Sequence, residues 1–149
     1  MRSLAVLSMH TSPLAQPGTG DSGGMNVYVR QLSAALARAG VSCEVFTRAW
    51  DPSQPKFVQV EPGFRVHHVQ AGPLAPLAKE ALPDLVDSFT EGVAVRLAEL
   101  ADRGAEIDAI HANYWLSGIA GHTLKHELGV PLVSTFHTLD RVKAEASPE

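Results

Sequence analysis

Cysteine is nearly absent from this 149-residue sequence, which contains a single one, Cys43. One thiol forms no internal disulfide, so the chain lacks the cross-links of small secreted domains, and we expect a buried thiol in a reducing compartment, the cytoplasm. Long apolar runs are also lacking. No stretch approaches the roughly 20 residues that cross a bilayer, and the run after Met1 is too short for a secretory signal, so we expect no stable membrane anchor.

Positive charge is not in excess either, because 12 Lys and Arg residues stand against 16 Asp and Glu residues, for a net charge of −4. Such a chain has no general attraction for phosphate backbones or anionic membranes, and we expect no nucleic acid partner. Any anionic ligand must therefore be held by locally placed donors. The length and the 45% hydrophobic content suit one globular domain.

Short apolar segments alternate with amphipathic segments along the chain. Five short segments have the length and pattern expected of strands: residues 4–8, 43–47, 65–69, 107–111 and 131–136. Three segments with apolar residues at helical spacing are each followed by a glycine that can end a helix: residues 25–39, 82–103 and 116–128. This alternation predicts an α/β fold, a doubly wound parallel sheet of the Rossmann-like type, whose ligands bind outside the carboxyl ends of the strands.

A glycine-rich loop, residues 18–26, lies between the first predicted strand and the first predicted helix. Glycines let the backbone approach a ligand closely, and the free N–H groups of the following helix attract an anion. The loop therefore predicts a phosphate site, with a merely flexible turn as the alternative.

Gly18, Gly20 and Gly23 also satisfy the dinucleotide-binding pattern G-x-G-x-x-G. However, eight residues separate Met9 from this pattern, which should follow its strand directly, and no ribose-binding carboxylate ends the second strand. An NAD-dependent dehydrogenase is thus a remote alternative.

Four segments resemble glycosyltransferase family 4, whose members have the GT-B fold: residues 10–29, 77–79, 110–118 and 134–139. The resemblance covers nearly the whole chain and is greatest to members that act on inositol phosphate, although sucrose-phosphate synthases share part of the first segment. It implies retaining transfer of a sugar, N-acetylglucosamine, from a UDP-sugar to 1D-myo-inositol 3-phosphate, the first step of mycothiol biosynthesis. It also implies that the chain is the N-terminal, acceptor-binding domain and that a C-terminal donor-binding domain is missing. We expect the chain to be inactive by itself.

The same resemblance assigns site residues by position. The UDP-sugar contacts fall on Gln16, Pro17 and Gly24. The acceptor contacts fall on His10, Asp21, Ser22, Gly23, Gly24, Met25, Asn26, Lys79, Tyr114 and Thr138. Three of these take the phosphate group, and an ammonium, a phenol and a hydroxyl can all donate to phosphate oxygens: Lys79, Tyr114 and Thr138.

His137 matches the histidine that lies against the transferred sugar, and we assign it the catalytic role of orientation and charge stabilisation. The resemblance implies no resident cofactor, since the UDP-sugar is a co-substrate.

Other interpretations of these residues stay open. Lys79 alone would be typical of a solvated surface, and Tyr114 of an aromatic core at a strand-to-helix turn. His122 and His126 lie one helical turn apart, but without a third ligand we expect a polar face and no metal. His67 and His68 are consecutive in a strand, so their rings point to opposite faces and form no single site.

A non-catalytic sugar-phosphate-binding module is the alternative from another functional class. A sucrose-phosphate-synthase-like transferase is the alternative within the enzymes. The sequence leaves the oligomeric state open, a homodimer included.

Overall fold

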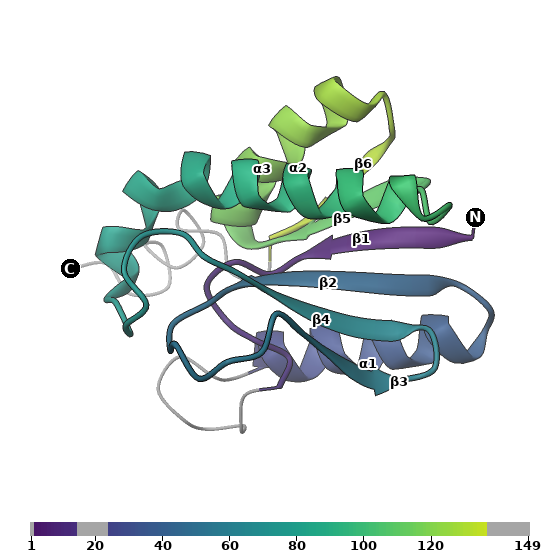
Figure 1. The fold of residues 1–149 in the computed structure, drawn as a ribbon, viewed down its shortest axis with the longest axis horizontal. Helices are drawn as coiled ribbons and strands as arrows, with labels where there is room; N and C mark the ends of the chain where they lie inside the picture. The colour runs from purple at the N-terminus through teal and green to yellow at the C-terminus, as the bar shows by residue number, and fades with distance from the viewer. Residues whose placement is uncertain (1, 15–23, 137–149) are drawn as a thin grey trace.

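The computed structural model of the chain describes residues 2–14 and 24–136 (Figure 1). In this part of the chain six strands form one sheet in the order β3-β4-β2-β1-β5-β6. The strands are β1 (Ser3–Leu7), β2 (Ser42–Arg48), β3 (Phe57–Glu61), β4 (Phe64–Val69), β5 (Ala109–Asn113) and β6 (Leu132–Thr135). The helices are α1 (Gly24–Arg38), α2 (Val86–Asp102), α3 (Tyr114–Leu128) and the 3₁₀ helix η1 (Lys79–Leu85).

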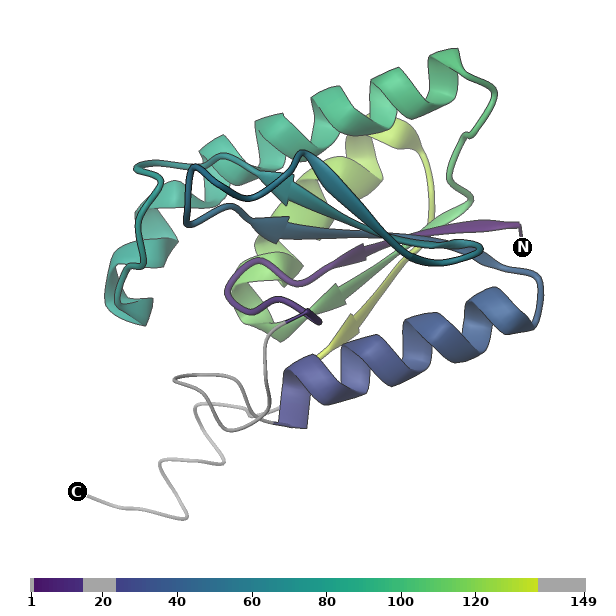
Figure 2. The same cartoon turned by 60° about the horizontal axis from the view of Figure 1, so that its bottom comes forward.

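Helices cover both faces of the sheet, α1 on one face and α2 with α3 on the other (Figure 2). Because side chains alternate along a strand, Leu4 and Val6 of β1 pack with Val29 of α1, whereas Ala5 and Leu7 belong to the core under α2 and α3. The predicted doubly wound α/β fold is confirmed. Cys43 is fully buried as expected, and burial together with the neighbouring Glu44 carboxylate raises the pKa of its thiol to about 11.

The sheet contains an edge strand that the sequence analysis missed. β3 pairs with β4 in antiparallel orientation, whereas every other neighbouring pair in the described sheet is parallel. Its residues are half-buried or exposed, so β3 lacks the continuous apolar run by which buried strands were found. The prediction of a purely parallel sheet was wrong at this edge.

Two element boundaries also differ from the prediction. The helix expected over residues 82–103 begins within η1, at whose end the Val86 N–H donates to Pro83 O, and α2 starts at Val86. The strand expected at 107–111 lies at Ala109–Asn113, because the Asp108 carboxylate accepts hydrogen bonds from the backbone N–H groups of Arg2 and Ser3 instead of facing the core. No helix among the described residues is long and apolar enough to cross a membrane.

Candidate acceptor site at the carboxyl edge of the sheet

Three residues assigned to the acceptor come together at the carboxyl ends of the strands. His10 follows β1, Lys79 begins η1 after β4, and Tyr114 follows β5 directly. The ring centroids of His10 and Tyr114 lie 4.4 Å apart, and Lys79 Nζ lies 5.6 Å from the centroid of the Tyr114 ring. All three residues are half-buried. We name this group the His10–Lys79–Tyr114 cluster.

Tyr114 has an unusual backbone for a residue with a side chain. Its φ is 75°, and among the described residues it is the sole non-glycine residue with a positive φ. The left-handed region costs an L-residue roughly 1–2 kcal/mol. Glycine would avoid this cost, so the strain indicates that the phenol ring is needed at this turn from β5 into α3. The ring also packs against the core under α2 and α3, so the interpretation of Tyr114 as aromatic core stays open.

Buried hydrogen bonds hold the turn that carries His10. Ser8 Oγ donates to Thr11 O at 2.7 Å, which closes the turn after β1. Met9 N–H donates to Ser117 Oγ at 2.9 Å, and Met9 O accepts from the backbone N–H of Arg48 at 3.1 Å. The residue before His10 is thus bonded to both β2 and α3.

The N-terminus of α1 lies near the same edge (Figure 2). Gly24 is the first residue of α1 and is exposed, and a Cβ added to it would meet no described atom within 4 Å. Met25 is half-buried against the core under α1, and Asn26 is 1% exposed. The first N–H groups of a helix have no intrahelical acceptor, so this end of α1 can receive an anion beside Gly24.

Seven assigned residues lie outside the described residues, and their roles stay predictions: Gln16, Pro17, Asp21, Ser22, Gly23, His137 and Thr138.

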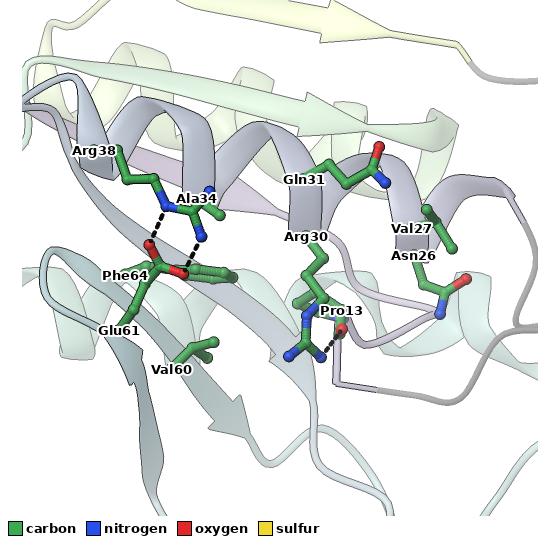
Figure 3. A pocket seen from close by; sticks show the side chains of 10 residues that line it. All are labelled: Pro13, Asn26, Val27, Arg30, Gln31, Ala34, Arg38, Val60, Glu61 and Phe64. Atoms are coloured by element: carbon green, nitrogen blue, oxygen red, sulfur yellow. Dashed lines mark hydrogen bonds and ion pairs between the residues drawn. The ribbon is translucent and has the colours of Figure 1, made fainter.

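A groove of about 570 Å³ runs along α1 beside β3 and β4 (Figure 3). Of the assigned residues, Asn26 alone lines it, at one end. At the other end Arg38 donates twice to the Glu61 carboxylate, at 3.0 and 3.1 Å (Figure 3). The Arg38 guanidinium is therefore already paired, and the groove is separate from the His10–Lys79–Tyr114 cluster.

The three histidines on the strands have structural partners. His67 Nε2 lies 2.6 Å from Glu44 Oε1, and His68 Nδ1 lies 2.8 Å from Pro55 O, so the two rings have separate partners, as the alternation of a strand predicts. His111 is buried, with Nε2 2.8 Å from Thr135 Oγ1.

His122 and His126 are exposed on α3, with their ring centroids 4.7 Å apart. No group of three metal-ligating side chains occurs in residues 2–14 and 24–136.

The sequence analysis missed two residues that shape the site, Arg48 and Ser117. Both act through backbone groups, Ser117 on Met9 and Arg48 on the segment before Lys79. Arg48 carried one signal, a second charged residue at the end of a buried strand, but nothing in the sequence indicated where its guanidinium points.

Comparison with known proteins shows the family of the chain. Residues 23–149 match the family model described as glycosyl transferase 4-like domain. The D-inositol 3-phosphate glycosyltransferase of Actinosynnema mirum is 51% identical over 143 residues, and the one of Xylanimonas cellulosilytica is 53% identical over 143 residues. Each comparison covers 96% of this chain and 34% of the relative, so the chain spans about a third of the length of these relatives.

Comparison with solved structures also finds glycosyltransferases. Sucrose-phosphate synthase from Thermosynechococcus elongatus matches with a TM-score of 0.90 and 35% identity, over 99% of this chain and 36% of that one. Os79 from O. sativa, solved in complex with UDP, matches with a TM-score of 0.59 and 18% identity over 89% of this chain and 28% of that one, which concerns the fold alone. These neighbours are GT-B glycosyltransferases. The chain belongs to the glycosyl transferase 4-like family.

Proposed function

We propose that this chain is the acceptor-binding part of a retaining glycosyltransferase that moves N-acetylglucosamine from a UDP-sugar to 1D-myo-inositol 3-phosphate, the first step of mycothiol biosynthesis. The observation that carries the proposal is the His10–Lys79–Tyr114 cluster. An ammonium and a phenol stand together at the carboxyl edge of a parallel sheet, where ligands of such folds bind. The names of the 51–53% identical relatives support inositol phosphate as the acceptor.

We assign each residue a role from the chemistry of its side chain or backbone. Lys79 and Tyr114 donate to the acceptor's phosphate, and His10 packs against the Tyr114 ring beside the polyol. Gly24 leaves open space at the positive end of α1 for the donor's diphosphate. In a retaining transfer of this type the acceptor hydroxyl attacks from the side of the leaving phosphate, which takes up its proton. The protein's part is then to position the two substrates and to stabilise the charge that develops on the diphosphate.

The remaining parts of the proposal concern the longer protein. The relatives are about three times as long as this chain, and we propose that a C-terminal domain completes the donor site. His137 would orient the transferred sugar, and Thr138 would join Lys79 at the phosphate. We further propose that the chain alone binds acceptor without turnover and that the complete enzyme works in the cytoplasm without a resident cofactor.

The test combines binding and transfer. Calorimetry on the chain alone should detect inositol 3-phosphate, and transfer should appear when the chain replaces the equivalent segment of the A. mirum relative. In that chimaera Lys79→Ala should raise the acceptor KM by roughly 10- to 100-fold, the loss of one charge-assisted hydrogen bond, and should leave the donor KM unchanged. Lys125→Ala, an exposed lysine on α3, is the matched control.

The outcomes separate the alternatives. Acceptor binding without transfer in the chimaera would favour a binding module. A hexose phosphate that outcompetes inositol 3-phosphate would favour a sucrose-phosphate-synthase-like transferase, which the TM-score of 0.90 to such an enzyme supports. The family match leaves no support for a dehydrogenase, and quenching of protein fluorescence by NADH would contradict that conclusion.

A further inference from the structure

Arg48, the last residue of β2, is a buried arginine that binds backbone carbonyls. It is 5% exposed. Its Nε donates to Ala71 O at 2.7 Å, its Nη1 to Ala75 O at 3.1 Å, and its Nη2 to Pro73 O. In the described part of the chain no carboxylate forms an ion pair with this guanidinium. The carbonyl dipoles of one segment therefore supply the stabilisation that a buried charge requires.

The three accepting carbonyls belong to the segment of residues 70–78 that joins β4 to η1. Gly72 lies in this segment with a φ of 74°, and a Cβ there would meet the Leu85 methyl groups at 2.9 Å. This left-handed turn lets the segment bend around the guanidinium, so that the carbonyls of three alternate residues face it. The end of this segment leads directly into Lys79.

The backbone of Arg48 reaches a second part of the site. Its N–H donates to Met9 O at 3.1 Å, directly before His10. The next residue, Ala49, donates its N–H to Val69 O at the end of β4. One residue thus contacts the segments that carry two of the three cluster members.

We propose that Arg48 is a positioning residue whose guanidinium fixes residues 70–78 so that the Lys79 ammonium stands over the Tyr114 ring, where the acceptor's phosphate binds. The inference rests on the proposed function for the identity of that ligand. The geometric part of the inference is independent of the proposed function, because the contacts of Arg48 and Lys79 exist without ligand. Removal of the guanidinium leaves three carbonyls without their donor, and the segment then turns them toward water and moves Lys79 away from the ring.

The test compares two arginines with the same chemistry in the full-length transferase. Arg48→Met keeps an unbranched apolar side chain and removes every donor, and Arg48→Lys restores one donor group. Arg96→Met is the matched control, because the Arg96 guanidinium also donates to two backbone carbonyls, Lys56 O and His68 O, on another part of the sheet. A purely structural role would lower the unfolding free energy of each variant without a selective rise of the acceptor KM in Arg48→Met.

We expect Arg48→Met to raise the acceptor KM by roughly tenfold or more while kcat and the donor KM change less than about threefold, because misplacing one phosphate donor weakens acceptor binding. Arg48→Lys should recover part of this loss, and Arg96→Met should keep the acceptor KM within about twofold of the wild type. Equal effects of Arg48→Met and Arg96→Met on all three constants would overturn the proposal.

A second measurement needs no acceptor. Reductive ¹³C-methylation of the lysines gives one NMR signal for Lys79, assigned with Lys79→Arg, and the Tyr114 ring should shift it. Arg48→Met, or Arg48→Lys if the first variant does not fold, should remove this ring-current shift, and Arg96→Met should keep it. Persistence of the shift in the Arg48 variants would overturn the positioning role. Loss of the shift with an unchanged acceptor KM would uphold the positioning role and contradict the proposed phosphate site at Lys79.

Discussion

Because Tyr114 has a left-handed backbone, we expect glycine to give a higher unfolding free energy than alanine at this position, the reverse of their usual order. We compare Tyr114→Gly with Tyr114→Ala. Both variants lose the ring, its contact with His10 and its contact with Lys79. They differ in that glycine adopts a φ of 75° without strain, whereas alanine keeps the steric conflict of the tyrosine.

The magnitudes follow from that difference. Loss of the half-buried ring and of the lysine contact should cost each variant roughly 2 kcal/mol of unfolding free energy. Glycine avoids the left-handed strain, which raises the unfolding free energy by about 1–2 kcal/mol relative to alanine. Its more flexible unfolded chain lowers the unfolding free energy by about 0.5–1 kcal/mol. The net expectation is that Tyr114→Gly is more stable than Tyr114→Ala by about 0.5–1 kcal/mol.

Urea unfolding followed by circular dichroism measures both variants. The control is the same pair of substitutions at Lys125, an exposed residue inside α3 with ordinary helical geometry. There glycine should be less stable than alanine by about 1 kcal/mol. If glycine is also the less stable residue at position 114, the turn is not strained, and strain no longer supports a functional role for Tyr114.

Tyr114→Phe separates the fold from the ligand. The ring and its contacts stay, so the unfolding free energy should change by less than about 0.5 kcal/mol. The acceptor KM should rise roughly 10- to 100-fold, because the phenol can no longer donate to the phosphate. An unchanged acceptor KM would remove Tyr114 from the phosphate site without affecting the strain argument.

Three further predictions concern other parts of the structure. Gly24→Val should leave the unfolding free energy within about 0.5 kcal/mol, because a Cβ there meets no described atom within 4 Å, and it should abolish transfer by the chimaera by blocking the diphosphate; unchanged donor kinetics would contradict a diphosphate there. Ser117→Ala should cost about 1–3 kcal/mol in urea unfolding by leaving the buried Met9 N–H without an acceptor; no loss would refute that bond's role. Burial raises the pKa of Glu44, but hydrogen bonds from His67 and Arg65 outweigh burial and hold that pKa below 4.5. The carboxylate therefore stabilises the fold above pH 4.5, and this stabilisation is lost as the pH falls through the folded pKa. The gap in unfolding free energy between wild type and Glu44→Gln should therefore close in acid, and parallel pH curves would be the contrary result.

The buried part of the fold was predictable because burial leaves a pattern in the sequence. A strand covered on both faces leaves a run of apolar residues, as in residues 4–7 of β1, and the predicted helix-ending glycines Gly40, Gly104 and Gly129 all have the positive φ that the role requires. β3 left no such run, since residues 58–61 alternate between apolar and polar side chains, as expected of a strand that is not buried on both faces. The α/β class was thus predictable, and the mixed orientation of the sheet was not.

The proximity of residues at the carboxyl edge was predictable for a different reason. Parallel strands bring their carboxyl ends to one edge however far apart they lie in sequence, so residues after β1 and β5 meet, as His10 and Tyr114 do. The resemblance to glycosyltransferases selected Lys79 from among the other lysines, because a lysine in a proline-rich segment has no pattern that distinguishes it from a surface residue. Its distance from the Tyr114 ring came from the structure alone.

The shape of the site depends on groups that a sequence does not display. Met9 contributes its N–H and its carbonyl, one to Ser117 and the other to Arg48, and any residue except proline could supply both. Arg48 in turn binds three carbonyls whose own side chains are irrelevant to the contact. Substitutions at the half-buried Ala75 that keep the backbone should therefore be tolerated, whereas Arg48 and Gly72 should not tolerate change, since one supplies the donors and the other supplies the turn that presents the acceptors. The residues that position this site thus act through hydrogen bonds to the backbone. The sequence pattern indicates only the residues expected to contact the ligand.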